Sequence, residues 1–290
     1  MDYTFTGVNQ ASLPLALPAM QFGNAIHRLL QHIAYANPAF GPILLSKYDL
    51  SDGYYRIPLQ PQAAVELAVV LPPIFTKPLV GIPLVLPMGW RYSPPFFCAY
   101  TETVADLAND CIRHRQPLPE HPSEPYMASC PVPLHPLTPY ARHAHNGHMA
   151  QQPVATVDVY MDDFLGIAQD HTKVLTQRAI LHSIDTIFRT HPHPDNPAHR
   201  KDTVSRTKLQ QGDGTWATSK VMLGWLLDTS DKTLRLPQHK ADRLVHLVEE
   251  FLPLKRTSRQ RWQQLLGELR HIATAIPGAK YLFSILQHVL

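Results

Sequence analysis

Residues 154–168 read VATVDVYMDDFLGIA, in which two apolar runs, Val154–Tyr160 and Phe164–Ala168, flank Met161-Asp162-Asp163. Short runs rich in β-branched and aromatic residues on either side of a turn sequence are typical of a β-hairpin. The pattern therefore predicts two antiparallel strands with adjacent carboxylates at the tip of the hairpin. Aspartate is common in turns, so an isolated Asp-Asp pair also has an ordinary structural explanation.

A third carboxylate gives the pair a chemical interpretation as well. Asp49 ends another apolar run, Ile43–Leu50, which also reads as a strand. If the three carboxylates met at strand ends, they would supply the oxygen ligands that magnesium prefers. Two such ions about 3.5–4 Å apart stabilise the entering and leaving oxygens of an in-line phosphoryl displacement. The spacing permits this chemistry but does not single it out.

The rest of the chain contains segments with helical periodicity and segments with strand periodicity, which predicts an α+β fold. Apolar residues at helical spacing indicate helices over 26–33, 97–111 and 180–188, whereas Tyr54–Leu59 and Val221–Leu227 read as strands. From residue 237 onward the apolar stripes are helical. The sequence contains no internal repeat.

The composition excludes several classes of protein. Of the 290 residues, 44% are apolar and 17% are charged, which is typical of a globular chain. The apolar stretches are short and broken by proline, so we expect no membrane span, which would need about 20 such residues. The N-terminus lacks the features of a signal peptide, and three scattered cysteines favour a reducing compartment. We therefore expect an intracellular protein, in the cytoplasm or nucleus, that is not secreted.

Residues 114–153 stand apart because they concentrate proline and histidine and show neither helical nor strand periodicity. His121 is the first of five histidines between residues 121 and 148. A zinc site would need closely spaced cysteines, and Cys130 stands alone. We expect an irregular, solvated insertion rather than a metal site.

Charge is divided unevenly along the chain. Residues 1–199 carry 11 lysines and arginines against 15 acids, a net charge of −4. Residues 200–290 carry 15 against 8, a net charge of +7. A basic rear half favours a bound polyanion, and an ordinary solvated surface explains the charges equally well.

Tyr160-Met161-Asp162-Asp163 resembles the Tyr-x-Asp-Asp signature of reverse transcriptases, and other motifs resemble that family in its own order. Residues 48–59, YDLSDGYYRIPL, resemble its first palm motif, and residues 86–97, LPMGWRYSPPFF, its second. Residues 221–225, VMLGW, resemble the primer grip, and residues 262–286 resemble the paired helices of the thumb. The resemblance runs from about residue 40 to the end and is closest to retrovirus-like and retrotransposon enzymes.

The resemblance implies a polymerase right hand with partial fingers (residues 1–47), an antiparallel-sheet palm with fingers elements (48–236) and a helical thumb (237–290). The palm would carry the insertion at 114–153. The implied activity is RNA-directed DNA synthesis for a retroelement, a nucleotidyl transfer with two Mg²⁺ ions, or Mn²⁺. The partners would be a primed RNA or DNA template and deoxynucleoside triphosphates, with no membrane.

The resemblance also implies roles for individual residues. The three aspartates would hold the metals, and Tyr54 would be the steric gate that excludes a 2′-hydroxyl. Other residues would contact nucleotide, primer or the nucleic-acid backbone. The nucleotide contacts would be Asp52, Gly53, Met88 and Gly89, the primer grip Met222, Leu223 and Gly224, and the phosphate contacts Lys255, Arg256, Arg259 and Arg261.

The chain departs from the family in places. Met88 replaces the glutamine of retroviral enzymes, and fewer than 50 residues precede Asp49, so that only Arg28 and Lys47 remain as candidate basic fingers contacts. Lys208 lies where a lysine that protonates pyrophosphate is expected, although a surface lysine is the simpler interpretation. Three alternatives remain: a catalytically dead truncated remnant that binds nucleic acid, an RNA-dependent RNA polymerase, which Tyr54 disfavours, and a structural protein with a chance Asp-Asp turn.

Overall fold

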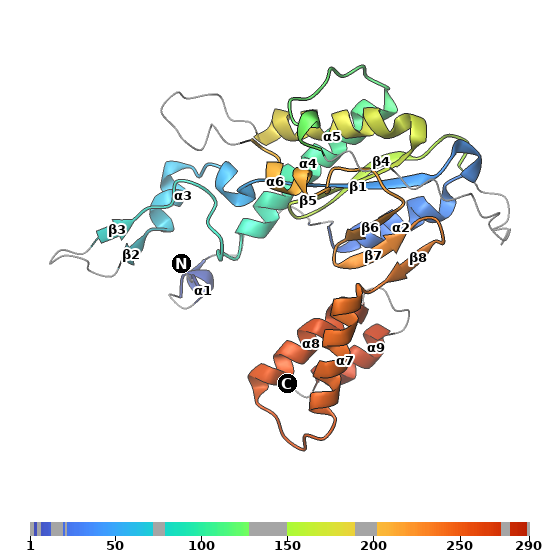
Figure 1. Cartoon of the computed structure of the whole chain (residues 1–290). Coiled ribbons are helices and arrows are strands. Elements are labelled where there is room, and N and C mark those ends of the chain that lie inside the picture. The colour runs from blue at the N-terminus through green and yellow to red at the C-terminus, as the bar shows by residue number, and fades with distance from the viewer. Residues whose placement is uncertain are drawn as a thin grey trace. The chain divides into compact units, whose positions relative to one another are not determined.

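The computed structural model describes residues 3–4, 7–12, 20, 22–71, 79–127, 150–188, 202–273 and 279–288 (Figure 1). Residues 128–149 of the predicted insertion therefore lie outside the described residues, as do residues 274–278 inside the predicted thumb motif, 262–286. The chain combines helices with small antiparallel sheets, so the α+β prediction is confirmed at this level. It divides into two compact units, Met1–Lys220 with Thr229–Asp231, and Val221–Asp228 with Lys232–Leu290.

The first unit is built on a three-stranded antiparallel sheet in the order β1 (Ile43–Asp49), β5 (Asp163–Gln169), β4 (Ala155–Tyr160). The predicted hairpin is thus confirmed as β4 and β5. Its turn is shorter than expected, because only Met161 and Asp162 lie between the two strands and Asp163 already belongs to β5.

Two helices cover one face of this sheet, α4 (Ser93–Arg113) and α5 (Lys173–Phe188) (Figure 1). Side chains alternate along a strand, so every second residue faces these helices. Tyr48, Val157 and Phe164 do so and are buried in the main apolar core with residues of both helices. α4 begins with Pro94-Pro95 in its first turn, where the missing N–H groups cost no hydrogen bond.

Helix α2 (Ala25–Tyr35) lies against the opposite face of β4. Asp158 alternates with the core residues Val157 and Val159, so its side chain leaves the other side of the sheet. Its carboxylate accepts two hydrogen bonds from Arg28, from Nε and Nη2, each 2.7 Å long. Arg28 therefore joins α2 to the sheet, and the structure does not support its candidacy as a contact for a triphosphate.

The predicted strand over Tyr54–Leu59 is wrong. Gly53–Arg56 form a short 3₁₀ helix, η3, which is followed by α3 (Pro61–Glu66) and by the two-stranded ribbon β2 (Val69–Leu71) and β3 (Leu79–Gly81). The side chain of Arg56 donates to the backbone oxygens of Ser51 and Asp202 at 2.6 and 2.5 Å. These bonds fold the segment back on itself instead of leaving it extended.

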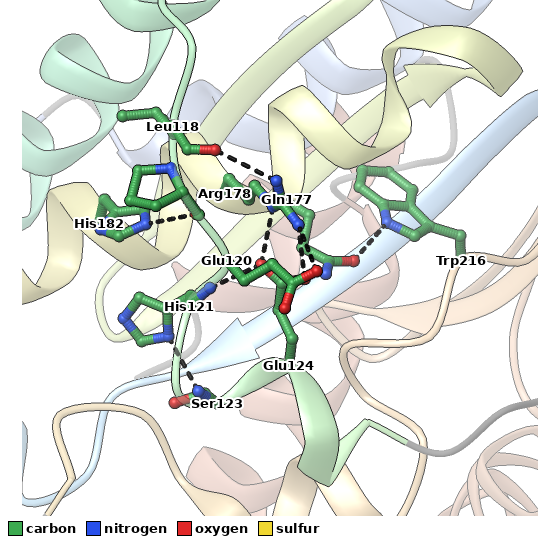
Figure 2. Close-up of polar contacts among 10 residues, drawn as sticks. Leu118, Glu120, His121, Ser123, Glu124, Gln177, Arg178, His182 and Trp216 are labelled. Atoms are coloured by element: carbon green, nitrogen blue, oxygen red, sulfur yellow. Dashed lines mark hydrogen bonds and ion pairs between the residues drawn. The ribbon is translucent and has the colours of Figure 1, made fainter.

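The first part of the predicted insertion, residues 114–127, is irregular and mostly exposed, as expected, but side chains of α5 hold it in place (Figure 2). Arg178 of α5 donates to the Glu124 carboxylate at 2.9 Å and to the Leu118 carbonyl at 3.1 Å. His121 is buried, accepts the Ser123 N–H at Nδ1 and lies 3.1 Å from Asp185 through Nε2.

The second unit contains a sheet in the order β6 (Ser219–Met222), β7 (Trp225–Asp228), β8 (Thr233–Arg235), of which β6 begins in the first unit. The single strand predicted over 221–227 is wrong, because Leu223 and Gly224 form a tight turn inside it. The helices α7 (Gln238–Phe251), α8 (Arg259–Ala273) and α9 (Ala279–Gln287) confirm the helical end of the chain. Within the described ranges, no helix is long and apolar enough to cross a membrane.

Candidate functional site

The strand register brings the predicted acids together at one end of the sheet. Asp49 of β1 is the direct partner of Asp163 of β5, and facing Cα atoms in an antiparallel pair lie about 4.5–5.5 Å apart. Both alternate with core residues and therefore lie on the sheet face away from α4 and α5. The Leu50 N–H donates to the Asp162 carbonyl at 3.2 Å. Asp162, the third acid, therefore lies next to the pair formed by Asp49 and Asp163.

The turn that carries Asp162 has an unusual backbone. Met161 has a φ of 57°, in the left-handed region that residues other than glycine rarely adopt, at a typical cost of about 1 kcal/mol or more. Its side chain packs against the core, and its Sδ lies 3.5 Å from the Cys98 Sγ. Met161 therefore anchors the turn, while Asp162 is exposed.

Two lysines contact the acids. Lys208, on the short helix α6 (Arg206–Gln210), forms an ion pair with Asp49. The Lys47 Nζ of β1 lies 3.3 Å from the Asp163 Oδ1 and 3.6 Å from the Asp213 Oδ2. The Lys208 side chain is 43% exposed, so it is a surface lysine that also pairs with Asp49, and Lys47 is paired with acids at the sheet. The sequence does not identify Asp213 as a residue of this site, because no motif surrounds it and it approaches Lys47 only in the folded protein.

The acids change one another's ionisation. Burial raises the pKa of Asp163, Lys47 opposes this shift, and the charges of Asp162 and Asp49 raise the pKa further. Burial lowers the pKa of Lys208, but its hydrogen bond to Asp49 and the surrounding carboxylates outweigh burial and raise it above its usual value. The raised pKa of Lys208 reflects the surrounding carboxylates, whereas that of Asp163 reflects burial first and its neighbouring carboxylates only second.

The chemistry of the donors fits a magnesium or manganese ion. Carboxylate oxygens are the ligands that these hard cations prefer, and the lysine ammonium groups already lie against two of the three carboxylates. Over the part of the chain that the structure describes, however, no three histidine, cysteine or acidic side chains are grouped so that they could hold a metal ion. Asp49 and Asp163 would have to reorient from their lysine partners to share a cation with Asp162.

Tyr54, the predicted steric gate, lies on η3 with its ring stacked on Phe97 of α4. The ring centroids are 4.4 Å apart and the planes differ by 19°. Burial, and after it the charges of Cys98 and Asp162, raise the pKa of Tyr54 to about 12. Gly53 is buried beside it, and a Cβ at this position would lie 2.8 Å from the Phe97 ring.

The other predicted nucleotide contacts lie in exposed turns of the first unit. Asp52 and Gly89 have φ values of 55° and 90°, and the Met88 side chain is 54% exposed. Asn9 of α1 (Val8–Ala11) donates from Nδ2 to the Gly89 carbonyl at 3.0 Å and accepts the Arg91 N–H at 2.9 Å. The N-terminal segment therefore holds the second motif in place.

The predicted primer grip is a strained hairpin of the second unit. Leu223 and Gly224 have φ values of 50° and 80°, the two positive values of a type I′ turn. Asparagine and glycine are the usual residues there, so leucine is a poor fit for the turn. Met222 is fully buried before it. Strain of this kind is concentrated at functional sites, which is compatible with the predicted role.

The predicted phosphate contacts of the second unit differ from one another. Arg261 pairs with Glu250 at 3.3 Å and lies over the Phe251 ring at 5.5 Å. Lys255, Arg256 and Arg259 are exposed, and none of them has an ion pair or hydrogen bond within the described chain. The side chains of these three are therefore accessible to a polyanion.

Comparison with known proteins gives no match, either to models of protein families or to the sequences of curated proteins.

Proposed function

We propose that this chain is the polymerase region of a retroelement reverse transcriptase, with a palm in its first unit and a thumb in its second. The observation that carries the proposal is the register pairing of Asp49 with Asp163 directly beside Asp162. Motifs that are 110 residues or more apart in the chain thus meet at one point, as the family resemblance requires. Chance Asp-Asp turns have no reason to meet a third acid.

The residues of the site have distinct roles in this proposal. Asp49, Asp162 and Asp163 bind two Mg²⁺ ions, which when bound stabilise the oxygens that enter and leave the α-phosphate. Tyr54 lies under the sugar of the incoming nucleotide and excludes a 2′-hydroxyl, and its stacking on Phe97 keeps the ring in position. Lys255, Arg256 and Arg259 bind nucleic-acid phosphates without regard to sequence.

Primer extension tests the proposal. The full chain is incubated with a primed homopolymer RNA template, the complementary deoxynucleotide and Mg²⁺ or Mn²⁺. We expect extension with deoxynucleotides that exceeds extension with ribonucleotides, and a loss of extension when EDTA is added. Extension that prefers ribonucleotides would instead indicate an RNA-dependent RNA polymerase.

The second candidate function is binding of nucleic acid without synthesis. It is favoured by the lysine contacts to Asp49 and Asp163 and by the absence of a ready metal group in the described residues. A gel-shift titration at several salt concentrations, run beside primer extension, separates the two functions. Salt-sensitive binding without extension in either metal would support this second candidate.

A further inference from the structure

Lys47 lies between two carboxylates that belong to different segments. Its Nζ is 3.3 Å from the Asp163 Oδ1 and 3.6 Å from the Asp213 Oδ2. The three side chains are 18%, 21% and 31% exposed, so the charges are partly shielded from water. One ammonium group is therefore shared between an acid of the candidate site and an acid outside the predicted motifs.

Asp213 is held firmly beside Lys47 by the backbone. The Lys47 N–H donates to the Asp213 carbonyl at 3.0 Å, on the edge of β1 that does not pair with β5. The Lys220 ammonium donates to the carbonyls of Gly212 and Asp213 at 2.8 and 2.7 Å. The Asp213 carboxylate thus remains within reach of Lys47 whatever happens at Asp163.

A cation at the candidate site and the Lys47 ammonium would compete for Asp163. Both need the same carboxylate oxygens, and two positive charges a few ångströms apart repel each other. Asp49 and Asp163 are register partners, so an ion shared by them would approach the Lys47 ammonium closely. The competition does not require Lys47 to enter solvent, because Asp213 offers a second ion pair.

We propose that Lys47 is a positioning residue that acts as an internal counter-ion. It neutralises Asp163 in the metal-free protein and transfers to Asp213 when a divalent cation binds. This inference rests on the proposed function, because it assumes that Asp49 and Asp163 share such a cation. Lys47 and Asp213 thereby adjust the affinity of the site for the metal, in addition to Lys208, which pairs with Asp49.

Two substitutions change that affinity in opposite directions. Lys47→Met keeps most of the side-chain volume and removes the competing charge, so the variant binds Mn²⁺ about three- to tenfold more tightly than the natural chain. Asp213→Asn removes the second partner of Lys47, so the ammonium stays on Asp163 and Mn²⁺ binds more weakly. Lys47→Arg keeps the charge and leaves the affinity within about twofold of the natural value.

The experiment titrates the full chain and each variant with Mn²⁺ alone and measures free Mn²⁺ by electron paramagnetic resonance. Thermal unfolding without metal is measured in parallel, and Lys232→Met, in an exposed turn distant in sequence from the acids, is the matched control. The inference is supported if Lys47→Met lowers the metal-free melting temperature yet tightens Mn²⁺ binding, while Asp213→Asn weakens binding. A purely structural role would lower the melting temperature without tightening the binding.

Two outcomes overturn the inference, and they differ in what else they affect. If the natural chain binds Mn²⁺ and Lys47→Met binds it equally or more weakly, the inference is wrong and the proposed function stands. If neither the natural chain nor any of the variants binds Mn²⁺, both the inference and the proposed function are wrong.

Discussion

The Tyr54 ring stacks on the Phe97 ring at a centroid distance of 4.4 Å, and this contact fixes the side chain that the proposal makes the sugar gate. Tyr54→Ala would open the space under the sugar, so we expect the ratio of ribonucleotide to deoxynucleotide incorporation to rise at least about tenfold. Tyr54→Phe keeps the ring and should keep the natural ratio. Equal ratios of ribonucleotide to deoxynucleotide incorporation for Tyr54→Ala and the natural chain would contradict the proposed role of Tyr54 as the sugar gate.

Because Gly53 has no side chain, the Phe97 ring can lie close to the backbone at residue 53 while it stacks on Tyr54. A Cβ at residue 53 would lie 2.8 Å from the Phe97 Cζ, closer than side-chain carbons approach. Gly53→Ala should therefore displace Phe97 and lower the free energy of unfolding by about 1–3 kcal/mol. Urea denaturation measures the loss, and Gly267→Ala, whose added Cβ meets no atom within 4 Å, is the control. Equal stability of the two variants would show that the contact is not tight.

Two buried hydroxyls of β1, the Ser46 Oγ and the Tyr48 hydroxyl, have at most each other as a partner in the described part of the protein, and that contact falls short of a well-formed hydrogen bond. An unpaired buried hydroxyl costs about 1–3 kcal/mol of desolvation, whereas a phenylalanine ring fills the same space without that cost. Tyr48→Phe should therefore leave the free energy of unfolding unchanged or raise it by about 1 kcal/mol. A loss of more than 1 kcal/mol in urea denaturation would mean that the hydroxyl is hydrogen-bonded in the folded protein, to Ser46 or to a bound water.

Stability at alkaline pH should depend on Cys98. Burial, with a smaller contribution from Glu102, raises the pKa of the Cys98 thiol from 9.0 to about 11. The thiol then ionises more readily in the unfolded chain than in the folded protein. Its stabilising contribution is complete below pH 9 and is lost as the pH rises to about 11.

The variant Cys98→Ala lacks this titration, so its free energy of unfolding should fall less steeply between pH 8.5 and pH 11. Denaturant titrations at several pH values give both slopes. A constant offset between the two proteins is expected from the lost side chain and does not bear on the prediction. Parallel slopes across the whole range would contradict it.

Local sequence patterns were sufficient to predict the elements that depend on apolar periodicity. Alternating apolar residues on either side of Met161-Asp162-Asp163 predicted the β4–β5 hairpin, and the helical stripes after residue 237 predicted α7, α8 and α9. The meeting of Asp49 with Asp163 was expected from the resemblance to a family, because apolar periodicity does not set the pairing of distant strands. The register itself required the structure.

The remaining features depend on contacts between distant segments. Tyr54–Leu59 alternates like a strand, but tertiary bonds from Arg56 to Ser51 and Asp202 fold it into a 3₁₀ helix. Gly224 is the turn signal within the apolar run 221–227, and its φ of 80° follows from the turn that it forms with Leu223. The pairs formed by Lys47 and Lys208 carry no sequence signal, since a single charged residue on a strand or short helix reads as solvated.

Asp162 offers the most direct test of the account, because it is exposed and its replacement should not disturb the fold. The measurement is the rate of primer extension by Asp162→Asn relative to the natural chain, at saturating Mg²⁺ and with matched thermal unfolding. The account predicts unchanged unfolding and a loss of extension of at least about a hundredfold, because one ligand of the metals is gone. Extension at the natural rate by the folded variant would contradict it.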